Sequence, residues 1–425
     1  MQDRSREQRI GIVGAGAAGL SLACYLADAG YRRITILERD SQPGGKCRSW
    51  RSGGRAWELG AILATTDYEA TLDMMARAGV RPWRAPAKRR AVDDSFVDQG
   101  IYPSERLFPG WIGLGELGPA LWQILKYHAL ARKWPAVFSP RNDDLPPELS
   151  LSFAEWAERY RMGTLAKLYA LPFTSFGYGY YDEVPAAYVL KYFEPGITRS
   201  LVLQGKFFSW EEGVQSVWER IARSFDVRYG TRPVRVRRRN VIALRCEDGS
   251  ELEFDRLILT SPLDESLSYL DADAEETELF GRIRHTDYRV FLCHVREMRI
   301  ESGFAPCRFG CEGTGRPMIW DRRHADSDLH TFYVLGSGQE SDAEIEEAIA
   351  ADVRLLGGTF TGTETSVRWK YFPHVGSEDL AGGYYRRLEA LQGRQSTYYA
   401  GELLAFSTIE RSVRYSRDLV ERFFA

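Results

Sequence analysis

Six glycine and alanine residues near the N-terminus form the pattern with the clearest chemistry in this chain. The stretch Gly14-Ala15-Gly16-Ala17-Ala18-Gly19 matches the GxGxxG fingerprint and lies between a predicted apolar strand, Ile10–Val13, and a predicted helix. A second predicted strand, Ile34–Leu37, ends in Glu38, about 20 residues past the fingerprint. A strand, a glycine turn, a helix and an acidic residue at this offset indicate a dinucleotide-binding unit.

Each residue of this pattern has its own expected role. Gly14 permits the tight turn, Gly16 lets a pyrophosphate approach the backbone, and Gly19 lets the helix pack closely on the strand. The helix that begins after Gly16 offers unpaired N–H groups and a positive dipole end to phosphates. Glu38 is expected to accept a hydrogen bond from a ribose 2′-hydroxyl, and its charge would repel a 2′-phosphate.

A second glycine pair favours FAD over a free pyridine nucleotide. A pyridine nucleotide must leave after hydride transfer, whereas a flavin stays and the chain wraps it with further backbone contacts. Gly44-Gly45-Lys46 supplies such a loop, in which Lys46 or Arg48 is expected to reach phosphate oxygens. Gly60-Ala61-Ile62 predicts another close backbone approach, beside the flavin ring. The predicted cofactor is therefore FAD.

Length and charge restrict the class of protein. The chain has 425 residues, too many for one hydrophobic core, and its net charge of −3 gives no reason to expect nucleic acid as a partner. The arginines of the run Arg235–Arg239 are expected on the exposed face of a strand and its turn. The polar start, Met1–Arg9, lacks an apolar signal segment, and no apolar run is long enough to span a membrane. These features predict a soluble, cytoplasmic protein.

The six cysteines are scattered along the chain, which fits reduced thiols rather than a disulfide framework. Cys307 and Cys311, with His294 upstream, have a spacing that a metal site can use. Because no second close pair accompanies them, no metal is predicted.

The predicted fold class is α/β, with a discontinuous Rossmann-like FAD-binding domain, an inserted mixed α+β substrate domain and a mostly helical cap. Alternating patterns over Asn240–Phe254, interrupted by Asp248-Gly249, predict a β-hairpin, and Ser341–Leu355 predicts an acidic helix. The expected limits of the FAD-binding pieces are 1–74, 211–269 and 366–425, with the helical cap at 75–210 and the substrate domain at 270–365. The substrate is expected where these pieces meet, since ligand sites favour domain junctions.

A second GxGxxG match, Gly113–Gly118, lacks a preceding strand and an acidic residue at the required offset. It is interpreted as a loop that enters the helix Pro119–Trp134, so no NADPH site is predicted there. This helix carries Leu121, Trp122 and Leu125 together with lysines. Two interpretations stay open: the helix rests transiently on a membrane surface, or it packs on its own domain.

Beyond these motifs, the chain resembles the flavin amine oxidase and phytoene desaturase superfamily. The likeness rests on the fingerprint, Gly44-Gly45-Lys46, the strand Arg232-Pro233-Val234 and the C-terminal Tyr399-Ala400-Gly401-Glu402. The resemblance implies that the backbone at Val234 meets the adenine and that Glu402 lies by the pyrophosphate and ribityl chain. Across the N-terminal, middle and C-terminal pieces, the expected cofactor-binding residues are Gly14, Gly16, Ala17, Ala18, Gly19, Glu38, Arg39, Gly45, Lys46, Gly60, Ala61, Ile62, Val234, Gly401, Glu402 and Ile409.

Within the superfamily, the chain is similar to the FAD-dependent polyunsaturated fatty acid double-bond isomerases, the linoleate isomerases. The similarity is dense at Gly44–Cys47, at Phe176–Tyr192 and from Tyr371-Phe372-Pro373-His374-Val375 to Tyr415-Ser416. It implies a substrate-anchoring arginine at Arg89, and pocket aromatics at Phe176 and Tyr178. A second family phenylalanine, beside the substrate carboxylate, falls on Val202, and this departure bears on which substrate the chain takes.

The resemblance implies a lipid or polyene as substrate and a reaction without net oxidation. A hydride would leave an allylic carbon for flavin N5 and return at another carbon, with the cation stabilised by aromatic faces. Net oxidation of a lipid, terpenoid, polyketide or amine is the alternative, and a non-catalytic flavin-binding protein is a further one. His374 is either a proton donor or a structural histidine, and Phe176 and Tyr178 are either pocket or core residues.

Overall fold

Parallel strands form the sheet that carries the glycine fingerprint. The computed structural model describes residues 4–83, 88–103, 114–143, 145–199 and 207–425. Within these residues the strand order of this sheet is β19-β13-β1-β2-β9, and every pairing in it is parallel. The strands are β1 (Ile10–Val13), β2 (Ile34–Leu37), β9 (Asp226–Arg228), β13 (Arg256–Leu259) and β19 (Thr397–Tyr399). Three segments that are distant in the sequence thus build one sheet.

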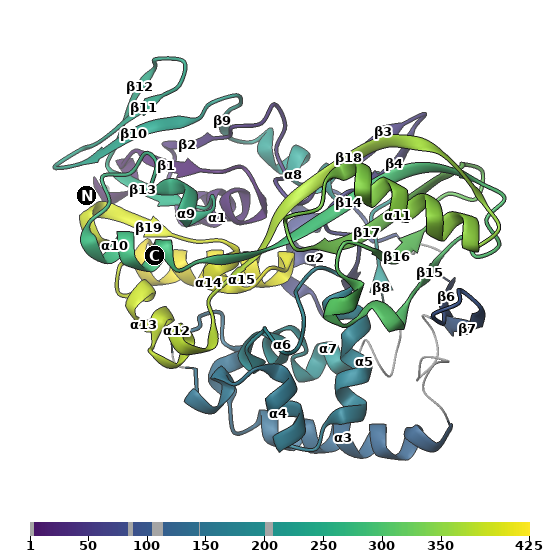
Figure 1. The fold of residues 1–425 in the computed structure, drawn as a ribbon. Helices are drawn as coiled ribbons and strands as arrows, with labels where there is room; N and C mark the ends of the chain where they lie inside the picture. The colour runs from purple at the N-terminus through teal and green to yellow at the C-terminus, as the bar shows by residue number, and fades with distance from the viewer. Residues whose placement is uncertain (1–3, 84–87, 104–113, 144, 200–206) are drawn as a thin grey trace.

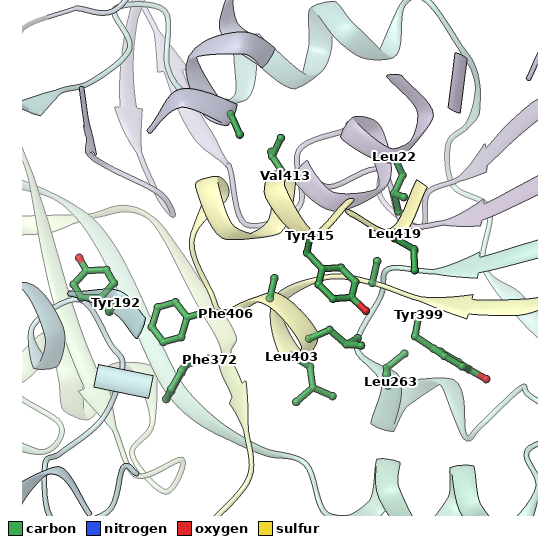
Figure 2. Close-up of a cluster of buried hydrophobic side chains, with 14 of the residues drawn as sticks. Leu22, Tyr192, Leu263, Phe372, Tyr399, Leu403, Phe406, Val413, Tyr415 and Leu419 are labelled. Atoms are coloured by element: carbon green, nitrogen blue, oxygen red, sulfur yellow. The ribbon is translucent and has the colours of Figure 1, made fainter. Parts of the chain in front are cut away.

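Two long helices pack together beside this sheet, and their contact forms much of the core. They are α1 (Ala17–Asp28) and α15 (Ile409–Phe423). In α15, Val413, Leu419 and Val420 recur at helical spacing and are buried. Figure 2 shows Leu419 of α15 directed toward Leu22 of α1. The helix α15 begins where the Thr408 hydroxyl accepts a hydrogen bond from the Arg411 amide, at 3.2 Å.

The second layer of the molecule is a sheet that is antiparallel except for the parallel pair β15–β6, and we call it the antiparallel sheet. It is covered on one face by α11 (Asp342–Leu355), as Figure 1 shows. Its strand order is β18-β14-β17-β16-β15-β6-β7. The strands are β6 (Lys88–Val92), β7 (Asp98–Pro103), β14 (Arg284–Arg296), β15 (Gly303–Phe304), β16 (Pro317–Asp321), β17 (Leu329–Gly336) and β18 (Thr359–His374). The expected domain limit between 365 and 366 therefore falls inside β18, and the segment expected to be mostly helical contributes β6 and β7 to this sheet.

The helical region lies on the other side of the molecule from the parallel sheet (Figure 1). Its helices are α3 (Leu117–Ala131), α4 (Phe153–Arg159), α5 (Gly163–Thr174), α6 (Ala186–Tyr192) and α7 (Pro195–Arg199). A 3-10 turn, Leu114–Glu116, leads into α3, so the described part of the second GxGxxG match is a helix entry rather than a strand turn. No helix in the described ranges is long and apolar enough to cross a membrane.

Smaller elements join these layers. Among them is the expected hairpin, β11 paired with β12, with β10 added alongside. The strands are β3 (Ser49–Ser52), β4 (Arg55–Glu58), β5 (Ala64–Thr65), β8 (Phe207–Phe208), β10 (Pro233–Arg238), β11 (Ile242–Cys246) and β12 (Glu251–Phe254). The helices are α2 (Glu69–Arg77), α8 (Gln215–Ala222), α9 (Leu263–Ser266), α10 (Ala274–Gly281), α12 (Ser377–Ala381), α13 (Tyr384–Glu389) and α14 (Glu402–Ala405).

The arginine run on β10 differs from the expectation at one position. Arg238 is fully buried, and its guanidinium pairs with both oxygens of Glu276, at 2.5 and 2.6 Å, and with Asp271, at 2.7 Å. Burial alone would raise the pKa of Glu276, but the bonds from Arg238 and Tyr399 hold it below its usual value. The prediction that this arginine is exposed was wrong. Helix α10, which contains Glu276, packs over this end of β10, and the sequence of β10 alone does not indicate that contact.

Replacing Arg238 tests this buried ion pair. Arg238→Met is expected to lower the free energy of unfolding by about 3–5 kcal/mol, because it leaves Glu276 charged and buried without its partner. The neighbouring Arg237 is exposed, and Arg237→Met is expected to change stability by no more than about 0.5 kcal/mol. Urea unfolding of both variants measures the difference. Equal midpoints would show that the pair contributes nothing.

Candidate active site

One elongated cavity of about 450 Å³ connects the glycine fingerprint with the antiparallel sheet. The parallel strands β1, β2 and β13 end at its first part, where ligands of open α/β sheets bind. Its second part is bordered by the antiparallel strands β14, β17 and β18. The cavity is therefore built from both layers, as a junction site is expected to be.

Close backbone contacts shape the first part of the cavity. A Cβ added at Gly19 would lie 1.9 Å from the Gly14 carbonyl oxygen, so only glycine permits α1 to lie this close to the turn. Gly14 itself has φ of +109°, which side chains disfavour. A Cβ added at Gly16 would meet no atom closer than 4.0 Å, and Gly16 lines the cavity. A Cβ at Gly16 would thus enter cavity space at an ordinary contact distance from its protein neighbours.

The carboxylate of Glu38 is fixed at the end of β2. One oxygen accepts a hydrogen bond from the Ala15 amide at 2.7 Å, and the other accepts from the Asp40 amide at 2.9 Å. Burial raises the pKa of Glu38, and these two amide bonds oppose the rise. Each oxygen keeps a lone pair for a hydroxyl in the cavity, since a carboxylate oxygen can accept more than one bond.

Lys46 and Glu402 join the two glycine-rich loops across the cavity. The Lys46 amine lies 2.6 Å from a Glu402 oxygen, and the Ser407 hydroxyl donates to the same oxygen at 3.2 Å. The same amine lies 5.5 Å from the ring centre of Tyr371. A Cβ added at Gly60 would lie 1.8 Å from the Lys46 carbonyl oxygen, so these segments also cross in close contact.

The N-terminus of α15 opens into the cavity as well. Ser407, Thr408, Ile409 and Ser412 line it there. The first N–H groups of a helix lack partners within the helix and carry partial positive charge. This end of α15 therefore suits the binding of a group that becomes more negative during a reaction.

Aromatic side chains surround the second part of the cavity, which we call the aromatic lobe. The ring centres of Tyr371 and Tyr178 are 5.4 Å apart, and those of Tyr371 and Tyr288 are 5.3 Å apart. Burial raises the pKa of each of these tyrosines, so they stay neutral phenols at physiological pH. The aromatic lobe consists of Phe176, Tyr178, Tyr192, Tyr288, Tyr333 and Tyr371.

Two hydroxyl groups of the aromatic lobe are held closely by backbone carbonyls. Tyr178 donates to the Ser407 carbonyl and Tyr288 donates to the Ser175 carbonyl, each at 2.8 Å. Thr286 donates to the carbonyl of Gly177 at 2.7 Å and so fixes β14 to the Phe176–Tyr178 segment. These bonds fix the orientation of the rings and direct their hydroxyl groups at backbone atoms.

Arg89 lies near the aromatic lobe but does not line the cavity. Its Nη2 is 3.5 Å from an Asp321 oxygen, beyond good hydrogen-bond distance, and its buried Nε has no partner among the described residues. Burial raises the pKa of Tyr288 and Tyr333, and the nearby Arg89 charge opposes that rise. The Nε of Arg89 is thus a donor without a partner among the described residues, in a guanidinium close to two rings of the lobe.

Most of the predicted site residues meet in this one cavity. Gly19 stands behind it and permits the helix packing, as expected, while Val234 lies one residue past the lining segment Thr231–Pro233 and has a half-exposed side chain. Val202 lies outside the described residues. The predicted residues that line the cavity are Gly14, Gly16, Ala17, Ala18, Glu38, Arg39, Gly45, Lys46, Gly60, Ala61, Ile62, Phe176, Tyr178, Gly401, Glu402 and Ile409.

Tyr192, Tyr288 and Tyr333 belong to the lobe and were not predicted from the sequence. Tyr288 and Tyr333 lie on β14 and β17, which pair with each other, and only this pairing shows that both rings share a face. His374 is buried, its Nδ1 bonds to the Phe372 carbonyl at 2.8 Å, and burial lowers its pKa to about 4. A histidine that is neutral at physiological pH and bonded to its own strand fits the structural interpretation.

A cluster of polar side chains also lines the cavity and consists of Asp264, His285 and Lys370. His285 bonds to Asp264 at 3.2 Å, and Lys370 pairs with the second oxygen of Asp264. Burial would raise the pKa of Asp264, but these two partners lower it to about 2. All six cysteines are free thiols, and no group of potential metal ligands occurs among the described residues.

The donor set and shape of the cavity fit FAD. Gly16 leaves space for a pyrophosphate beside the start of α1, and Glu38 offers acceptors for a ribose. Lys46 supplies a cation, and the N-terminus of α15 supplies the positive end of a helix dipole. The aromatic lobe follows these groups along one continuous cavity, so a substrate can lie against the flavin ring.

Gly16→Val tests the assignment of the phosphate end. We expect a folded protein that retains less than about a tenth of the flavin of the parent, because the side chain fills the space that the pyrophosphate needs. Gly281→Val is the control, since a Cβ there meets no atom within 4 Å and lies away from the cavity. Flavin absorbance per protein and the far-ultraviolet spectrum are the measurements. Full flavin content in Gly16→Val would contradict the assignment.

Comparisons with known proteins support the assignment of FAD to this cavity. The family described as flavin containing amine oxidoreductase matches residues 17–417. The crystal structure of a CLA-producing fatty acid isomerase from P. acnes has 32% sequence identity to this chain and a TM-score of 0.90, with 99% of each chain covered.

Two further relatives align over most of the sequence. An FAD-dependent oxidoreductase of Apiospora sacchari is 25% identical, over 93% of this chain and 88% of its own length. The β-cyclopiazonate dehydrogenase of Aspergillus flavus is 23% identical, over 94% of this chain and 89% of its own length. The chain therefore belongs to the flavin-containing amine oxidoreductase family, in the branch that includes the P. acnes isomerase, and is an FAD-dependent enzyme.

Proposed function

We propose that this enzyme moves a carbon–carbon double bond within a polyunsaturated fatty acid, without net oxidation. The observation that carries the proposal is the full-length similarity to a fatty acid isomerase, at 32% identity and a TM-score of 0.90. The aromatic lobe and the partly satisfied guanidinium of Arg89 support it, because they suit an apolar chain with a carboxylate at one end.

Bound FAD supplies a hydride acceptor that can return the hydride to the substrate. The protein contributes the surroundings of the carbon chain. The faces of Tyr178, Tyr288 and Tyr371 stabilise positive charge that develops on an allylic carbon. The enclosed lobe keeps water from adding to that cation.

Arg89 sets which carbon faces the flavin. A carboxylate that binds its guanidinium forms charge-assisted bonds, and the fixed distance from this anchor to the lobe then selects one segment of the chain. Asp321 lies 3.5 Å from Nη2 of Arg89, so a substrate carboxylate would share the guanidinium with Asp321 or replace it there.

Net dehydrogenation of an apolar substrate is the second candidate. The β-cyclopiazonate dehydrogenase and the oxidoreductase of Apiospora sacchari favour it, since each aligns over more than nine tenths of this chain. Dehydrogenation removes a proton as well as a hydride and therefore needs a base beside the reacting carbon. The aromatic lobe offers neutral phenols there, which favours return of the hydride.

Anaerobic incubation with linoleic acid separates the two candidates. The flavin-loaded enzyme is expected to form a conjugated diene, measured by absorbance, without oxygen or an added electron acceptor. Flavin-free Gly16→Val protein is the control and should form none. Product that appears only with an electron acceptor, in one equivalent per acceptor reduced, would favour the dehydrogenase instead. Flavin that neither bleaches nor turns over with linoleic acid would contradict the proposed substrate.

Arg89→Met tests the carboxylate anchor. We expect kcat/KM for linoleic acid to fall about 10- to 100-fold, chiefly through KM, because a charge-assisted contact is lost. Arg90→Met is the matched control, since Arg90 follows in the same strand, points to the opposite face and pairs with Asp98. Linoleyl alcohol, which has no carboxylate, should react alike with parent and Arg89→Met. Unchanged kinetics with linoleic acid would show that Arg89 is not the anchor.

A further inference from the structure

The outer face of α3 is apolar and exposed. Leu121, Trp122 and Leu125 have 48%, 66% and 57% of their surface exposed, although they are among the largest apolar side chains of the helix. Leu121 and Trp122 each lie one turn before Leu125 on the exposed side, while Ala120, Ile124 and Tyr127 face the protein. Figure 1 shows α3 along the edge of the molecule, with α4 and α5 between it and the rest.

Basic side chains accompany this apolar face. The helix α3 contains no acidic residue, and the exposed Arg132 and Lys133 follow it directly. Neither has a carboxylate partner among the residues that the structure describes. The Lys126 amine bonds to the Tyr160 carbonyl at 2.6 Å, which brings it beside the exposed Arg159 and Arg161. Acidic side chains lie nearby as well: Glu116 at the start of α3 is paired with Lys167, Glu148 accepts a hydrogen bond from the Trp134 indole, and Glu155 and Glu158 are exposed. The five basic side chains named here outnumber these four acids.

We propose that α3 docks onto the surface of a lipid bilayer that contains anionic lipids. An exposed stripe of Trp and Leu bordered by Lys and Arg matches helices that lie in the membrane interface. In such a pose Leu121, Trp122 and Leu125 enter the boundary between headgroups and acyl chains, and Arg132 and Lys133 meet lipid phosphates. The 15 residues of α3 lie along the surface and do not cross the bilayer.

The packing of α3 connects this surface with the cavity. The Gln123 side chain accepts a hydrogen bond from the Leu165 amide at 2.9 Å, which holds the start of α5 against α3. The end of α5 leads directly to Phe176 and Tyr178 of the aromatic lobe. A fatty acid, the proposed substrate, is found in bilayers, so this inference fits the proposed function. Vesicle binding is nevertheless measured without substrate. Failure of this inference and failure of the proposed function are therefore distinguishable.

Vesicle flotation of the flavin-loaded enzyme tests the inference. We expect the parent to float with vesicles of phosphatidylcholine and phosphatidylglycerol, and more weakly with phosphatidylcholine alone. The triple variant Leu121→Gln, Trp122→Gln, Leu125→Gln should bind about 100-fold more weakly, because three side chains no longer bury apolar surface in the lipid. Arg132→Gln with Lys133→Gln should remove the preference for the anionic vesicles.

Leu355→Gln is the matched control, because Leu355 is a similarly exposed apolar residue at the end of a different helix, α11. It should bind vesicles as the parent does, and every variant should keep its flavin and melting temperature. A parent that does not float, or a triple variant that floats equally well, would overturn the proposal. So would a parent that is dimeric without vesicles and becomes monomeric in the triple variant, since a second copy would then cover this face.

Discussion

The close approach of backbone to backbone at the glycine turn is the constraint on which the site depends. Because a Cβ at Gly19 would lie 1.9 Å from the Gly14 carbonyl oxygen, α1 can begin at the edge of the parallel sheet only with glycine there. The Gly44 amide donates to the Ala15 carbonyl at 2.9 Å, which holds the second loop against the first. These contacts leave helix amides and the Glu38 carboxylate facing one cavity, and so create a place for a nucleotide.

The antiparallel sheet extends this cavity into a substrate site because β14, β17 and β18 border the part beyond the nucleotide end. Strand β14 pairs with both β17 and β18, which brings Tyr288, Tyr333 and Tyr371 together. Beyond Tyr371, β18 continues to Phe372, whose ring packs at 5.4 Å from Phe406, just before α15 (Figure 2). The strand that contributes Tyr371 to the lobe thus also packs against the turn that leads into α15, which connects the lobe with the cofactor end of the cavity.

Local sequence signals predicted the fold elements that border the nucleotide end of the cavity, because these elements are encoded within a short stretch of chain. The strands β1 and β2 and the helix capped by Ser341 followed from spacing and residue type. Long-range contacts could not be predicted in this way. The local pattern predicts that Arg238 is exposed, but Arg238 is buried because it pairs with Glu276, 38 residues away. Tyr288 likewise joins the lobe only through strand pairings that the sequence of β14 does not encode.

The distribution of charge around the cavity bears on the type of reaction. The acidic groups that border the lobe face cations. Glu402 is engaged by Lys46 and Ser407, Asp321 lies 3.5 Å from Arg89, and Asp264, with its pKa near 2, is a weak base paired with His285 and Lys370. Asp264, His285 and Lys370 line the same cavity, but successive residues of a strand face opposite sides, so Lys370 and Tyr371 point in different directions. Between the rings a cation on the substrate meets aromatic faces and neutral hydroxyls. Such surroundings stabilise a cation without accepting its proton, and return of the hydride then competes well with proton loss.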